Sequence, residues 1–103
     1  MIVYSVTITL NLKDGPDWER YMMDKHLDDV VNTGCFAFAN LRKVLEENED
    51  KNEVSYVGEY FAPNRASLER YYRDFADEMR KDANSRFEGK IKASRKVYEL
   101  IEK

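Results

Sequence analysis

The order of hydrophobic patterns along the chain restricts its fold more than any other feature of the sequence. Apolar residues alternate with polar ones over residues 2–12, as in a half-buried strand, and strand-like runs recur at 35–46, 53–62 and 90–101. Apolar residues recur at helical spacing over 16–32 and 65–87. The resulting order, β-α-β-β-α-β, predicts an α+β, ferredoxin-like fold: a four-stranded antiparallel sheet with two helices on one face.

Residues that favour turns or helix ends separate these segments. Gly15 and Pro16 end the first strand, Gly34 follows the first helical segment, and Asn64 is suited to cap the second. The polar, acidic segment 47–52 predicts a solvated connection between the second and third strands. Nothing in 1–103 resembles a linker or a repeat, so a single domain is expected.

Right-handed crossovers place the first and third strands at the centre of such a sheet and the second and fourth at its edges. Charged side chains keep edge strands from pairing with other chains, and the two predicted edge strands are rich in basic residues. These residues are Arg42, Lys43, Lys90, Lys92, Arg95 and Lys96.

The two faces of the predicted sheet differ in polarity. The apolar series of the first strand, from Ile2 to Leu10, is expected to face the helices together with Tyr56, Gly58 and Tyr60 of the third. The opposite face then carries Ser5, Thr7, Thr9 and Glu59 together with the apolar Val3, Val57 and Phe61. Such a mixed face predicts a symmetric homodimer joined through the open side of the sheet. Glu59 is expected to form a salt bridge across that interface, to a basic residue of the fourth strand.

Charge and composition argue against several classes of partner. The chain of 103 residues carries 17 basic and 20 acidic residues, a net charge of −3, which does not favour binding to nucleic acid. No apolar run is long enough for a membrane span, and the first residues do not resemble a secretory signal. The single cysteine, Cys35, indicates a reducing compartment, so a cytoplasmic location is expected. Cys35 has no histidine near it in sequence, which argues against a nucleophile.

His26 is the leading candidate for chemistry because it is the only histidine and titrates near neutral pH. Helical spacing places it on an apolar ridge with Trp18, Met22 and Val30, beside a second ridge of Met23, Leu27 and Val31. His26 is either a general acid or base at a pocket or a structural residue near a helix end. With one histidine and no suitably spaced carboxylates, no metal site is expected. Aromatic residues are predicted to converge on the layer beside His26: Tyr4, Trp18, Phe36, Phe38, Tyr56 and Tyr60.

Three stretches resemble a bacterial family of unknown function: 1–8, 18–34 and Tyr60-Phe61-Ala62. That family is similar to the dimeric α+β barrels, which include antibiotic-biosynthesis monooxygenases, muconolactone isomerases and heme-degrading enzymes. The resemblance implies a homodimer with a small-molecule site between sheet and helices, but no particular reaction.

Two hypotheses follow for the function. The first is a small-molecule-binding protein, or a cofactor-independent enzyme of monooxygenase or isomerase type. In it, His26 is the acid–base group and the ligand contacts Tyr4, Trp18, Met22, Phe38, Tyr56 and Tyr60. The second is a non-catalytic regulatory or scaffolding homodimer, in which these residues only stabilise the core.

Overall fold

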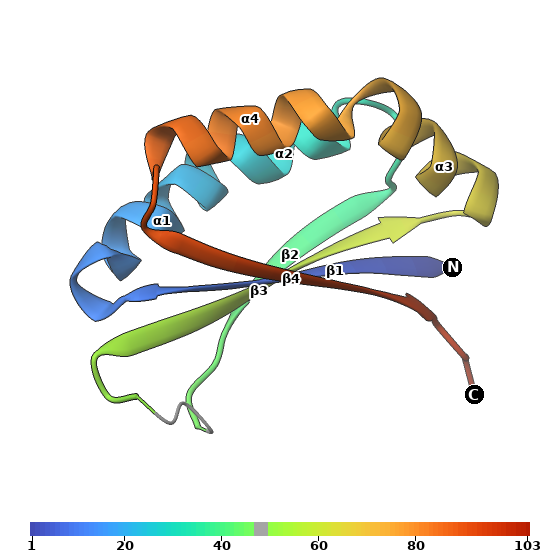
Figure 1. The fold of residues 1–103 in the computed structure, drawn as a ribbon. Helices are drawn as coiled ribbons and strands as arrows, with labels where there is room; N and C mark the ends of the chain where they lie inside the picture. Colours follow the sequence, from blue (N-terminus) through green and yellow to red (C-terminus); the bar gives the residue numbers. More distant parts are fainter. Residues whose placement is uncertain (47–49) are drawn as a thin grey trace.

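The computed structural model describes residues 1–46 and 50–103 and contains one antiparallel sheet of four strands (Figure 1). Its strands are β1 (Ile2–Asn11), β2 (Phe38–Lys43), β3 (Glu53–Ala62) and β4 (Ile91–Glu99), in the spatial order β2-β3-β1-β4. The ferredoxin-like fold and the central position of β1 and β3 are therefore confirmed. Residues 47–49 of the predicted polar connection lie outside the described residues.

The first helical segment is built from several short elements. A 3-10 turn, η1 (Leu12–Asp14), leads into α1 (Gly15–Tyr21), which has Pro16 in its first turn. A π-helical turn, η2 (Met22–His26), joins α1 to α2 (Leu27–Val31). Because the Leu27 N–H bonds to the Met22 carbonyl, five residues back, this turn is wider than an α-helical one.

The second helical segment is two helices, α3 (Arg65–Asp74) and α4 (Ala76–Arg86), and not the single helix expected. The Asn64 side chain caps α3 by accepting from the Ser67 N–H at 2.9 Å, as predicted. The backbone leaves the helical region at Phe75, where φ is −133°. Tyr71 of α3 and Ala76 of α4 are both buried although they lie five positions apart. The break between them thus lets both helices keep a buried face toward the sheet.

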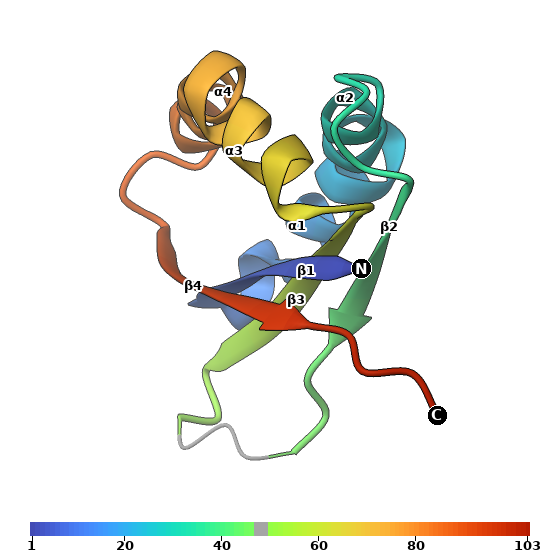
Figure 2. The same cartoon turned by 90° about the vertical axis from the view of Figure 1, so that its right-hand side faces the viewer.

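Both helical segments cover the same face of the sheet, as Figures 1 and 2 show. The core lies between these layers and includes Tyr4, Ile8 and Leu10 of β1 with Tyr56 and Tyr60 of β3. The prediction of which residues face the helices is confirmed. Within the described part of the chain, no helix has the length and apolar character that a membrane span needs.

Strand β2 is shorter than the predicted segment 35–46. Cys35 and Phe36 are buried in the core, and the chain reaches the sheet only after the Ala37 N–H bonds to the Phe61 carbonyl at 2.8 Å. The register then pairs Phe38 with Phe61, and the two rings stack on the open face with centroids 4.3 Å apart. The prediction that Phe38 shares the helix-facing layer with Phe36 is wrong, because the strand begins after Phe36.

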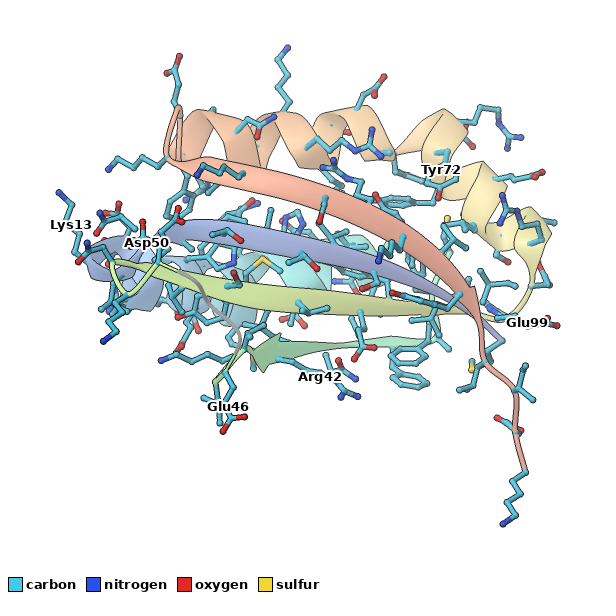
Figure 3. The ribbon with its side chains drawn as sticks, turned by 60° about the horizontal axis from the view of Figure 1, so that its bottom comes forward. Lys13, Arg42, Glu46, Asp50, Tyr72 and Glu99 are labelled. Atoms are coloured by element: carbon cyan, nitrogen blue, oxygen red, sulfur yellow. The ribbon has the colours of Figure 1, made fainter. Side chains whose placement is uncertain are left out.

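The open face of the sheet is seen from below in Figure 3. Glu59 lies here and pairs with Arg42 of the neighbouring strand β2, with 2.6 Å between Oε1 and Nε. Within the chain, Glu59 therefore has a partner on the second strand, and the expected salt bridge to the fourth strand of a second copy stays a prediction. The two residues come together because β2 and β3 are adjacent and both side chains point to the open face.

Candidate functional site

A cavity lies between the helix-facing side of the sheet and the helical layer. It contains about 580 Å³ of space free of atoms, counting its open mouth. The part that water-sized molecules can enter is about 50 Å³, well below the usual volume of small-molecule sites, so a larger ligand would extend into the open mouth. Side chains that line it include Tyr4, Val6, Ile8, Trp18, Met22, His26, Tyr56, Tyr60, Tyr71, Met79, Arg80, Ala83, Asn84, Ile91, Ala93 and Arg95.

The cavity reaches the edge strand β4 because α4 leaves that strand uncovered. The register places Ala93 opposite Ile8, Arg95 opposite Val6 and Val97 opposite Tyr4, so these side chains share the helix-facing side of the sheet. Ile8 and Tyr4 are buried, whereas Ala93 and Arg95 are exposed and Val97 is 38% exposed. Ala93 and Arg95 therefore lie where the cavity meets solvent.

The π-helical turn brings His26 together with Tyr21. The Tyr21 hydroxyl lies 3.1 Å from Nδ1 of His26, and it donates to Oδ2 of Asp82 on α4 at 2.7 Å. Since the hydroxyl proton goes to Asp82, the Tyr21 oxygen accepts from Nδ1–H of His26. This assigns the proton of the neutral imidazole to Nδ1 and leaves Nε2 as an acceptor with no hydrogen-bond partner among the described residues.

The electrostatic environment favours this arrangement. Burial lowers the pKa of His26 to about 4, although the carboxylates of Asp29 and Asp82 act in the opposite direction. Burial, followed by the hydrogen bond to Asp82, raises the pKa of Tyr21. The same hydrogen bond holds the pKa of Asp82 below its usual value. At neutral pH the three groups are thus a neutral imidazole, a neutral phenol and a carboxylate.

Tyrosine rings form one wall of the cavity. The ring of Tyr60 lies 6.5 Å from that of His26 and 5.9 Å from that of Tyr4, whose ring is 5.9 Å from Tyr71. Burial raises the pKa of Tyr60 and of Tyr71, so both are neutral phenols at physiological pH. The Tyr56 hydroxyl donates to Glu19 at 2.8 Å and is already paired. The wall therefore presents a series of neutral aromatic surfaces between His26 and Tyr4.

The structure brings most of the predicted site residues together. Tyr4, Trp18, Met22, Tyr56 and Tyr60 line the cavity with His26, and Phe38 lies on the other face of the sheet. Whether these residues bind a ligand stays a prediction.

Several residues of the site were not predicted: Tyr71 and Arg80 line the cavity, and Tyr21 and Asp82 hold His26 beside it. Tyr21 follows Trp18 by three positions, a helical spacing that sequence reasoning could have used. It is buried, whereas Met23, assigned to the apolar ridge, is 59% exposed. Among residues 1–46 and 50–103, no three His, Cys, Asp or Glu side chains are grouped as metal ligands would be.

Solved structures of similar fold cover nearly the whole chain. A protein from Arabidopsis thaliana is 12% identical, with a TM-score of 0.71 over 99% of this chain and 97% of that one. An EthD family protein from Bacillus halodurans is 12% identical, with a TM-score of 0.65 over 98% and 100% of the two chains. A variant of SnoaB, a cofactor-independent oxygenase from Streptomyces nogalater, is 10% identical, with a TM-score of 0.61 over 99% and 95%. At these identities the similarity concerns the fold.

No curated protein matches the chain. The model of a family described as a domain of unknown function, DUF4286, matches residues 1–101, and the chain therefore belongs to that family.

Proposed function

We propose that the protein binds a small, ring-containing molecule in the cavity between its sheet and helices, and that His26 acts on this ligand. The observation that carries the proposal is the pairing of a neutral His26, fixed through Tyr21 to Asp82, with a cavity that opens to solvent beside it. Flat tyrosine surfaces beside His26 suit a planar ligand. The fold it shares with SnoaB is compatible with such a site.

The chemistry proposed for His26 is acceptance of a proton at Nε2. In this step an acidic C–H or a phenol O–H of the ligand transfers its proton to Nε2, and the electron pair stays on the ligand. The positive charge that forms on the imidazole is stabilised by Asp82 through the Tyr21 hydroxyl, which keeps the ring oriented. Because burial lowers the pKa of His26 to about 4, this step needs a ligand whose own proton is acidic, or a rise of that pKa when the ligand binds. Proton transfer of this kind uses only the side chain and the ligand, and we propose that the protein needs no cofactor.

We further propose that the working form is a cytoplasmic homodimer joined through the open face of the sheet. Paired positions across all four strands place Phe38, Phe61, Val3 and Tyr98 in one apolar row on this face. Phe38 and Tyr98, at the two ends of the row, are 48% and 50% exposed. A second copy covering this row would bury them. The buried free thiol of Cys35 is compatible with the reducing cytoplasm.

The proposed ligand site is tested by a thermal-shift screen of planar, ring-containing metabolites. A ligand that binds the native form raises the melting temperature. Ala93→Phe places a large side chain at the cavity mouth, at an exposed position where the core is not disturbed. We expect hits on the native protein to be lost in Ala93→Phe and kept in Ala66→Phe, the same change at an exposed position on α3. Hits that persist in Ala93→Phe would place the site elsewhere.

A further inference from the structure

We propose that the cavity selects an aromatic carboxylic acid, whose carboxylate is bound by Arg80 and Arg95 and whose ring lies along the tyrosine wall. This inference rests on the proposed function, since it specifies the ligand class of the same cavity. It is carried by two unpaired donors in the cavity wall and by the charge of the side chains around them.

Arg80 lies on α4 and lines the cavity. One of its guanidinium nitrogens forms a hydrogen bond, and another has no acceptor among the described residues. Its Nη2 donates to the Tyr4 hydroxyl at 3.2 Å. Its Nε is buried and has no acceptor among the described residues. A buried N–H without a partner is costly, and the cost is larger for a charged group. An oxygen of a bound ligand would satisfy it.

Trp18 supplies the second unpaired donor. The side chain is 2% exposed and lines the same cavity, yet its indole Nε1 also has no acceptor within residues 1–46 and 50–103. Indole nitrogen is a donor only, so a ligand that satisfies it must offer an acceptor. Two orphaned donors in one wall favour a ligand rich in acceptor oxygens.

The charge around the cavity has the sign that an anion requires. Although the chain has a net charge of −3, the described residues that line the cavity include Arg80 and Arg95 and no aspartate or glutamate. In the part of the chain that the structure describes, neither arginine forms a salt bridge. An anionic ligand would therefore meet two guanidinium groups that form no salt bridge among the described residues, although the carboxylate of Asp77 acts on Arg80 from a distance.

Arg95 is placed to act at the mouth of the cavity. It lies on the helix-facing side of β4, opposite Val6, and is exposed. Burial raises the pKa of Tyr60 and of Tyr71, and the positive charge of Arg95 acts in the opposite direction. The charge of Arg95 is therefore felt at the tyrosine wall. Arg95 is thus available to attract an anion that enters from solvent, while Arg80 offers a buried donor further inside.

The series of ring contacts along the wall indicates how a ring-containing ligand would lie. Tyr60 lies between His26 and Tyr4 in the series of ring contacts, and Tyr4 touches Arg80. A ring lying over Tyr60 with its carboxylate toward Arg80 would direct its opposite edge toward His26. Guanidinium groups bind the planar carboxylate through pairs of parallel hydrogen bonds, which favours a carboxylate at this place.

The test is isothermal titration of the full chain with benzoate and 2-naphthoate, their neutral amides, and phenylphosphate. We expect at least one acid to bind about tenfold or more tightly than its amide, since charged hydrogen bonds are the stronger ones. Arg80→Gln and Arg95→Gln should each weaken binding of the acid and reduce its advantage over the amide. Lys81→Gln removes the same charge from the neighbouring, exposed position on α4. It should change neither the affinity for the acid nor its advantage over the amide.

The outcomes separate this inference from the proposed function. Equal affinity for acids and amides, or an acid affinity that neither arginine substitution changes, would overturn the inference and leave the cavity as a ligand site. If phenylphosphate binds more tightly than the carboxylic acids, the inference of a carboxylate is wrong and the ligand class is a phosphate ester. If no probe binds, the inference is wrong, and the thermal-shift screen decides the proposed function separately. Arg95→Gln changes an exposed residue, so it reports on binding even if Arg80→Gln does not fold.

Discussion

Tyr21 and His26 lie five residues apart in the sequence, and one wide helical turn sets the Tyr21 hydroxyl 3.1 Å from Nδ1 of His26. In a regular α-helix, residues three and four apart share a face, whereas residues five apart do not. The π-helical turn η2 therefore creates this contact. Such turns occur often at functional sites, which agrees with the role proposed for His26.

Removing the Tyr21 hydroxyl should destabilise the protein and release His26. In Tyr21→Phe, Nδ1–H of His26 loses its acceptor and Asp82 loses its principal donor, which together should lower the free energy of unfolding by about 1 to 3 kcal/mol. Urea unfolding measures this change. Tyr72→Phe is the matched control, because Tyr72 is partly exposed and forms no hydrogen bond among the described residues. Equal losses in the two variants would contradict the role of the Tyr21 hydroxyl.

His26 should make the protein less stable in mild acid. Its pKa is lowered by burial from 6.5 to about 4, so over this interval the unfolded chain binds a proton that the folded chain does not. The free energy of unfolding then falls as the pH is lowered, by up to about 1.4 kcal/mol per pH unit from this group. The depressed pKa of Asp82 acts in the same direction at lower pH. Urea unfolding at a series of pH values measures the slope.

His26→Gln isolates the part of this pH dependence that belongs to the imidazole. The variant should lose the slope between pH 6.5 and about 4 and keep the contribution of the carboxylates. An NMR titration of the native protein should give the same low pKa for the imidazole. A pKa near 6.5, with equal slopes in the two proteins, would show that His26 is solvated.

The sequence was sufficient to predict the fold because its signals are local and agree with one another. Alternation in β1, the Asn64 cap and the charged edge strands all indicate the same topology, and the structure confirms it. His26 and most of the aromatic residues around the cavity could be identified for the same reason. They lie on the apolar faces of regular elements, where periodicity shows which way each side chain points.

The remainder of the site depends on departures from regular structure. No periodic pattern marks the π-helical turn that joins Tyr21 to His26 or the break at Phe75 that sets α4. Asp82 and Arg80 on α4 look like ordinary surface charges in the sequence. Phe38 was misplaced because strand β2 begins later than its composition suggests, and a shift of this kind changes which face a residue occupies.

The proposed dimer should depend on the apolar row of the open face. Phe38→Glu places a charge in that row at a position that is already 48% exposed, so the monomer should still fold. Light scattering should then report a monomer where the native chain is a dimer. Met23→Glu, at a position 59% exposed on the helical side, should remain dimeric. A native chain that is monomeric at micromolar concentration would rule out the interface.

Gly34 should be required where the chain leaves α2. Its φ is +84°, a conformation that residues with a side chain rarely adopt, and its N–H bonds to the Val31 carbonyl at 3.0 Å. Gly34→Ala should lower the free energy of unfolding by about 1 kcal/mol, and Gly34→Asn by less, because asparagine tolerates this conformation. Thermal or urea unfolding of the two variants compares them. Equal stability of Gly34→Ala and the native chain would contradict the assigned backbone conformation.

The central claim, that the cavity beside His26 is the ligand site, is tested most directly by NMR shift mapping with benzoate or a hit from the thermal screen. We predict that the largest shifts fall on residues of the cavity, namely the His26 ring, Tyr60, Ala93 and Arg95, and that Ala93→Phe abolishes them. Shifts confined to Phe38, Tyr98 and their neighbours on the open face of the sheet would contradict the account.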